Sequence, residues 1–119
     1  MINVLPKAND VIIPIEKFTK YALNYDKQAD KAIAFELALG YTLANANKLI
    51  ENIRNNLTNF PATHKGNLKG YGDVYEVELL LTGENGNIAK VLTGWLDDTE
   101  TGQMRLTSVY VNNIGGFIQ

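Results

Sequence analysis

Cysteine is absent from this chain of 119 residues, and histidine occurs once, as His64. Without cysteine there is no disulfide, no thiolate zinc site and no cysteine nucleophile. A single imidazole excludes His-rich metal clusters and mechanisms that need two histidines. The acidic side chains cluster within residues 26–30, 76–78 and 97–100, and none of these clusters has the twelve-residue spacing of a calcium loop. We therefore expect no bound metal and no other cofactor.

Long apolar runs and a strong excess of charge are also missing. Pro6, Lys7, Asn9 and Asp10 interrupt the apolar residues near the start, so we expect neither a secretory signal nor a membrane span. Eleven basic and thirteen acidic side chains give a formal net charge of −2. This balance argues against a protein that coats nucleic acid by charge alone, but it is compatible with an enzyme that binds one short stretch.

Apolar spacing in the first half of the chain predicts three helices, over residues 15–23, 29–39 and 43–57. Pro14 suits the first turn of the first helix, Gly40 can end the second in the left-handed conformation, and Thr42 can cap the third. The third helix has the most regular apolar face, which repeats at steps of three and four residues along Leu43, Ala46, Ile50, Ile53 and Leu57.

The second half of the chain changes to the period of two that is typical of strands. We predict strands over residues 74–81, 88–96 and 104–111, a hairpin turn at 83–86 and a loop over 62–72. Helices followed by a meander of strands indicate an α+β fold, in which N-terminal helices pack on one face of an antiparallel sheet. We expect one domain over residues 1–119, whose tail, 112–119, is frayed or forms a short edge.

Two groups of residues are candidates for chemistry. The run from His64 and Lys65 to Tyr71 combines an imidazole, lysines and glycines, which can bind phosphate. On this run alone, however, we favour a flexible basic surface loop. Thr93 and Trp95 share a face of one predicted strand, while Arg105 and Thr107 share a face of the next. Together they could bind phosphate and stack on a base, but for Trp95 we favour core packing.

A set of short motifs runs in order from residue 5 to residue 111. The N-terminal ones are Leu5-Pro6-Lys7-Ala8, Val11-Ile12-Ile13-Pro14, Lys17, Tyr21, Leu23-Asn24, Lys31-Ala32, Phe35 and Ala38-Leu39-Gly40. The later ones are Tyr71-Gly72, Tyr75, Val77, Thr82-Gly83, Asn85-Gly86, Val91, Thr93, Trp95, Arg105-Leu106-Thr107 and Tyr110-Val111. In this order and spacing the chain resembles DUF6883, a family of small bacterial domains often found at the C-terminal ends of polymorphic toxins and phage-associated proteins.

The resemblance implies a toxin-like domain of the barnase, EndoU, colicin and RelE-like (BECR) class, with helices on a curved antiparallel sheet. Many domains of that class are metal-independent ribonucleases that cleave tRNA or other cellular RNA. In their reaction the RNA's own 2′-hydroxyl attacks the adjacent phosphate and leaves a cyclic phosphate. The resemblance also implies a cognate immunity protein as partner and action in the cytoplasm, with delivery into target cells as part of a larger toxin as one route.

Matching the family motifs residue by residue implies catalytic roles for Lys31, Tyr71, Arg105 and Thr107. Lys31 would neutralise phosphate charge, Arg105 and Thr107 would hold the scissile phosphate, and Tyr71 would stack or donate a proton. We assign substrate binding to His64, Lys65, Thr93 and Trp95. Relatives often carry His where this chain has Asp30, which weakens any mechanism with a histidine base. The alternative is a non-catalytic protein-binding or adaptor domain, or an immunity-type partner, which the acidic balance and Asp30 favour.

Overall fold

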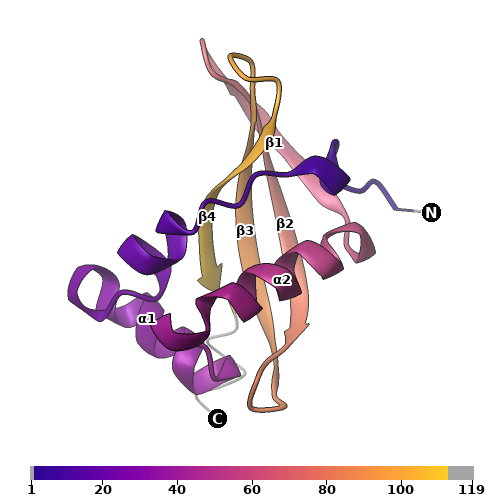
Figure 1. Ribbon diagram of the computed structural model, residues 1–119. Helices are drawn as coiled ribbons and strands as arrows, with labels where there is room; N and C mark the ends of the chain where they lie inside the picture. The colour runs from indigo at the N-terminus through magenta and orange to yellow at the C-terminus, as the bar shows by residue number, and fades with distance from the viewer. Residues whose placement is uncertain (1, 113–119) are drawn as a thin grey trace.

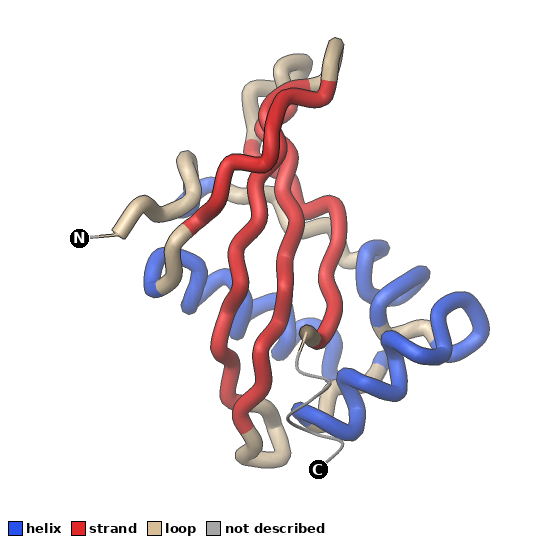
Figure 2. The backbone as a smooth tube through the Cα atoms, turned by 180° about the vertical axis from the view of Figure 1, so that it is seen from behind, coloured by secondary structure: helices blue, strands red, loops and turns tan. Residues whose placement is uncertain are grey.

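Helices cover one face of a four-stranded antiparallel sheet in the computed structural model, which describes residues 2–112 (Figure 1). The strands are β1 (Ala62–Leu68), β2 (Gly72–Thr82), β3 (Ile88–Asp98) and β4 (Met104–Val111), and they lie in that order across the sheet. Seen from behind, the sheet lies in front of the helices, and no described helix covers its other face, here called the open face (Figure 2). The predicted α+β class and antiparallel meander are confirmed, while residues 113–119 of the predicted tail lie outside the described residues.

The core lies between the sheet and the helices. Alternate residues of β2 and β3 turn toward the helices and are buried, among them Val77, Leu79 and Val91. Side chains of the helical layer, such as Phe35 and Ile53, belong to the same buried cluster. The alternation of side chains with a period of two therefore separates a buried face of these strands from an open one, as the sequence predicts.

The predicted first helix is instead built mainly as a π-helix, η2 (Phe18–Ala22), in which the Leu23 amide donates to the Phe18 carbonyl at 2.9 Å. Helix α1 (Tyr25–Leu39) begins earlier than expected, because the Asn24 side chain accepts hydrogen bonds from the first backbone amides and caps it. Gly40 ends α1 at φ 76°, as predicted. Within α1, Gln28 has non-helical dihedral angles (φ −140°, ψ 68°) that kink the helix.

The predicted third helix is confirmed as a 3-10 turn, η3 (Leu43–Asn45), followed by α2 (Ala46–Asn56) and a further 3-10 turn, η4 (Leu57–Asn59). Thr42 caps it as predicted, and Asn45 completes a reciprocal capping box. Leu43 was expected on the apolar face but is 46% exposed. A short 3-10 turn, η1 (Ala8–Asp10), precedes these elements. No helix among residues 2–112 is long and apolar enough to cross a membrane.

The predicted loop over residues 62–72 is wrong, because most of it is the edge strand β1. Its residues pair with β2 from Ala62 opposite Val77 to Leu68 opposite Gly72, with an irregularity between His64 and Gly66. An edge strand needs few apolar side chains, since backbone hydrogen bonds to one neighbour hold it and polar residues protect its other side. The polar composition therefore carried no strand signal.

Candidate anion-binding site

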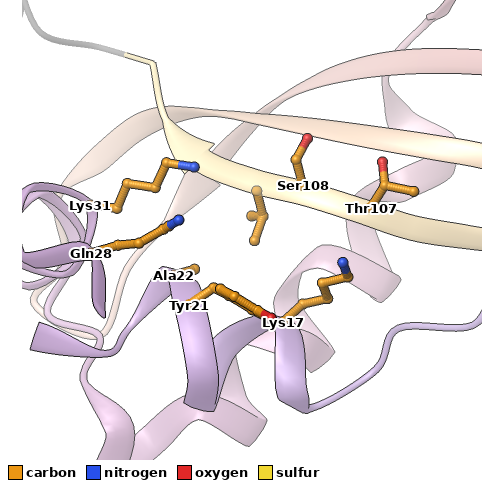
Figure 3. Close-up of a pocket in the computed structure, with 8 residues that line it drawn as sticks. Lys17, Tyr21, Ala22, Gln28, Lys31, Thr107 and Ser108 are labelled. Atoms are coloured by element: carbon orange, nitrogen blue, oxygen red, sulfur yellow. The ribbon is translucent and has the colours of Figure 1, made fainter. Parts of the chain in front are cut away.

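A cavity of about 140 Å³ lies beside β4, between that strand and the helical segments η2 and α1. Its lining residues are Lys17, Tyr21, Ala22, Gln28, Lys31, Thr107, Ser108 and Val109, and we call it the edge pocket. Figure 3 shows the amino groups of Lys17 and Lys31 reaching toward β4 from the helical side, while the hydroxyl groups of Thr107 and Ser108 lie on the strand itself. The pocket thus joins residues that are far apart in the sequence.

Two irregularities of the helical layer place its side chains in the edge pocket. Lys17 directly precedes the π-helix, and Tyr21 lies in it, one wide turn later. In α1, the kink at Gln28 interrupts the helical path one turn before Lys31. Both features depart from regular α-helix, and such departures are frequent at functional sites.

A third irregularity brings the two hydroxyl groups together on β4. The pairing register between β3 and β4 shifts at this point: Gly94 pairs with Ser108, but the next residue, Trp95, pairs with Leu106. Thr107 is therefore the extra residue of a β-bulge. In a regular strand Thr107 and Ser108 would point to opposite faces of the sheet. Because of the bulge, both are exposed and both line the edge pocket.

The charge that the described residues give the edge pocket is positive, since two lysines and no carboxylate among residues 2–112 line it. All nine lysines of the chain lie among residues 2–112, and only Lys17 and Lys31 are half-buried rather than exposed. Neither forms an ion pair with a described carboxylate, although three other lysines of residues 2–112 do: Lys7, Lys48 and Lys65. An ammonium group that no carboxylate occupies is available to bind the negative charge of a ligand.

Aromatic rings stand beside these two ammonium groups instead. The Nζ atom of Lys17 lies 5.7 Å from the centre of the Tyr21 ring, and that of Lys31 lies 5.3 Å from the centre of the Tyr110 ring. Both distances are within the range of cation–π contacts. A ring attracts a cation without neutralising it, so neither contact competes with an anion as a carboxylate would.

The arrangement can bind a tetrahedral oxyanion such as a phosphate group. Lysine ammonium groups supply charge-assisted hydrogen bonds, and the Thr107 and Ser108 hydroxyls and the Gln28 amide supply neutral ones. The Tyr21 hydroxyl can also exchange a proton with a bound group. Among residues 2–112 no three His, Cys, Asp or Glu side chains come together as a potential metal site.

Of the predicted catalytic residues, the structure brings Lys31 and Thr107 together in the edge pocket. Arg105 lies on the same strand as Thr107, before the bulge, and does not line the pocket. Tyr71 is in the turn between β1 and β2, where the residue is 62% exposed and lies outside the pocket. Only part of the predicted constellation therefore forms one site.

The predicted substrate-binding residues His64 and Lys65 lie on β1, also outside the edge pocket. His64 Nε2 is 3.3 Å from the Asp73 carboxylate, and Lys65 pairs with Glu76. A hydrogen bond from Asn67, followed by the contact with His64, lowers the pKa of Asp73 below its ordinary value of 3.8. Both side chains are thus matched to carboxylates of the neighbouring strand β2, as in a structural sheet surface.

The predicted substrate-binding residues Thr93 and Trp95 are completely buried in the core. The indole Nε1 of Trp95 donates to the Thr93 hydroxyl at 2.8 Å, and that hydroxyl donates to the Val77 carbonyl at 2.7 Å. Neither side chain can reach a ligand from this position, so we do not retain them as binding residues. The physical reason is that both face the helices, which agrees with the core-packing interpretation of Trp95.

Four polar residues of the edge pocket were not predicted as site residues: Lys17, Tyr21, Gln28 and Ser108. Lys17 and Tyr21 do belong to the N-terminal motif on which the family resemblance rests, so a signal for them was present. Gln28 and Ser108 had none, because the kink and the bulge that expose them are not visible in residue spacing.

Fold and pocket together define a class: an α+β domain with helices on one face of an antiparallel meander and a cationic pocket beside its last strand. Residues 4–113 match the model of the family described as Domain of unknown function (DUF6883), and the chain belongs to this family. No curated protein and no solved structure was found to match the chain.

Proposed function

We propose that this domain is a metal-independent ribonuclease whose edge pocket binds the scissile phosphate. The observation that carries the proposal is the pair of half-buried lysines, without carboxylate partners among the described residues, beside two consecutive hydroxyl groups. A phosphodiester matches this set, since it has one negative charge and several acceptor oxygens. The family resemblance supports RNA as the substrate, with tRNA as the first candidate, and a BECR-like toxin as the class.

The proposed reaction needs a proton acceptor, a proton donor and positive charge near the phosphate. The 2′-hydroxyl oxygen attacks phosphorus, and its proton passes to the acceptor. The bond from phosphorus to the 5′-oxygen breaks, that oxygen takes up a proton from the donor, and a 2′,3′-cyclic phosphate remains. Lys17 and Lys31 would stabilise the negative charge that grows on the phosphate oxygens. Thr107 would orient the phosphate, and Tyr21 is the candidate for proton transfer.

A toxin of this kind would act in the cytoplasm of a target cell, and a cognate immunity protein would block it. The resemblance supports both statements. The edge pocket adds a site at which such a partner could act, since covering Lys31 and Thr107 would close it.

Incubation with total tRNA in the presence of EDTA tests the proposal. We expect cleavage that ends in a cyclic phosphate and that falls at least about tenfold in Lys31→Met and in Lys17→Met, because a charge-assisted hydrogen bond is lost in each. Lys27→Met and Lys20→Met are the matched controls, since these exposed lysines belong to the same helical segments but do not line the pocket. Intact RNA at high concentrations of folded protein would exclude the ribonuclease function.

A second candidate function is binding of an RNA or another polyanion without cleavage. It is favoured by the lining of the edge pocket, to which residues 2–112 contribute no imidazole and no carboxylate, because these groups are the usual proton acceptors of catalysis. Expression in bacteria separates the two functions. A ribonuclease should be toxic as wild type and harmless as the Lys31→Met, Thr107→Ala double variant, whereas a binding domain should be harmless in both forms.

A further inference from the structure

Two kinds of contact hold five of the lysines among residues 2–112. Lys7, Lys48 and Lys65 each pair with a carboxylate of β2, β3 or the turn between them. In the edge pocket, Lys17 and Lys31 each stand over a tyrosine ring. The difference matters for ligand binding, because a carboxylate would compete with an incoming anion and a ring does not.

Tyr110 is the ring that holds Lys31, although it does not itself line the edge pocket. It follows Ser108 by two positions on β4, and the register places both on the open face, opposite Leu92 and Gly94. Lys31 comes from α1 on the helical side of the sheet. Its ammonium group therefore reaches the strand that carries the two hydroxyl groups and meets a half-buried ring there.

We propose that Tyr110 is a positioning residue, whose ring holds the Lys31 ammonium group in place for a phosphate bound beside Thr107 and Ser108. The proposal rests on the proposed function only in taking a phosphodiester as the ligand of the edge pocket. A free lysine side chain has many rotamers, and ordering it on binding costs affinity. A ring that favours one position lowers this cost while the charge of Lys31 stays available.

Tyr110→Phe and Tyr110→Val form the matched pair that tests this role. Phenylalanine keeps the ring without the hydroxyl, and valine keeps an apolar residue suited to a strand without the ring. The probe is a short, labelled, single-stranded DNA, which carries phosphodiesters but lacks the 2′-hydroxyl that the proposed cleavage needs. Its affinity is measured over a range of salt concentrations, and thermal unfolding confirms that each variant is folded.

We expect wild-type affinity for Tyr110→Phe and an affinity about two- to fivefold weaker for Tyr110→Val. The salt dependence should be unchanged in both, since no charge is removed, whereas Lys31→Met should lower the slope of log affinity against log salt by about 0.7. In a Lys31→Met background Tyr110→Val should have no further effect, because there is no ammonium group left to hold. A purely structural role of Tyr110 would weaken binding in that background as well.

Three results would overturn the role of Tyr110: unchanged affinity in Tyr110→Val, equal losses in Tyr110→Phe and Tyr110→Val, or additive losses with Lys31→Met. Should Tyr110→Val fail to fold, Tyr110→Leu takes its place in the same cycle. DNA binding without any RNA cleavage would reject the ribonuclease and leave the role of Tyr110 supported. Binding of neither nucleic acid would reject both.

Discussion

Replacing Thr93 by valine tests whether this residue and Trp95 belong to the core or to a binding surface. Valine has nearly the shape of threonine, so the substitution keeps the volume of the side chain and removes only its hydroxyl group. That hydroxyl accepts from the Trp95 indole and donates to the Val77 carbonyl, and all of it is buried. Both partners lose a hydrogen bond in a place that water does not reach.

The expected loss in the free energy of unfolding follows from the Trp95 indole N–H, which is left without a hydrogen-bond partner. A buried donor without a partner costs about 1–3 kcal/mol, and the added apolar methyl group of valine offsets only part of it. For a chain of this length, 1 kcal/mol corresponds to about 4 °C in melting temperature. Thr93→Val should therefore melt about 4–12 °C below the wild type.

Urea unfolding followed by fluorescence measures this cost directly, because Trp95 is the only tryptophan in the chain. A double-mutant cycle with Trp95→Phe isolates the bond between the two side chains, since phenylalanine has no N–H to leave unpaired. Circular dichroism replaces fluorescence in the phenylalanine background. There Thr93→Val should cost about 1 kcal/mol less than in the wild type.

Two results would refute the reasoning. Wild-type stability of Thr93→Val would show that the buried hydroxyl is not needed by its partners. Wild-type stability with weaker RNA binding would show that Thr93 reaches a ligand, as the sequence had suggested. Lower stability with unchanged RNA binding by the folded protein is the outcome that the core position requires.

Three further changes have defined outcomes. Gly72→Ala should cost more than about 3 kcal/mol in urea unfolding, because Gly72 has φ 142° and a Cβ atom there would overlap the Asp97 carbonyl oxygen; near-normal stability would contradict this. Gly94→Ala would place a Cβ atom 2.5 Å from the Ser108 hydroxyl oxygen, so we expect that hydroxyl group to rotate away. The free energy of unfolding should fall by about 1 kcal/mol, and RNA binding should weaken. RNA binding as in the wild type would argue against a role for Ser108. Because the pKa of Asp73 is lowered in the folded protein, its carboxylate contributes stability above the unfolded value of 3.8 and loses it as the pH falls through the lower folded value. Urea titrations between about pH 5 and pH 2 should therefore show that the free energy of unfolding falls more steeply with decreasing pH in the wild type than in Asp73→Asn. Equal slopes in the two proteins would refute the lowered pKa of Asp73.

Local signals in the sequence were sufficient for most of the framework. Thr42 and Gly40 mark helix ends because capping and the left-handed conformation depend on a few neighbouring residues. The alternation in residues 74–81 and 104–111 marks strands because one face of the sheet is covered and the other is open. The start of α1, predicted at residue 29 and found at Tyr25, is also decided locally, since the side chain of Asn24 caps the amides next to it.

The site was predictable only in part. Lys31 and Thr107 were selected from the family motifs and do meet in the edge pocket. Ser108 was not selected, because a regular strand would turn it away from Thr107, and the bulge that joins them depends on pairing with β3. Tyr71 was also selected from the family motifs, and Thr93 from the face of a predicted strand. Neither signal shows whether a side chain faces the core, the far turn or the pocket.

The sequence by itself determined the class of fold, the strands β2 to β4, the family and two residues of the pocket. Only the tertiary structure decided that a polar segment is the edge strand β1, that Trp95 faces the helices, and that Lys17 and Lys31 meet the hydroxyl groups of β4. The physical reason is the range of the interactions involved. Periodicity and caps arise from neighbours along the chain, whereas strand pairing, the bulge and the edge pocket arise from contacts between segments that are far apart in sequence.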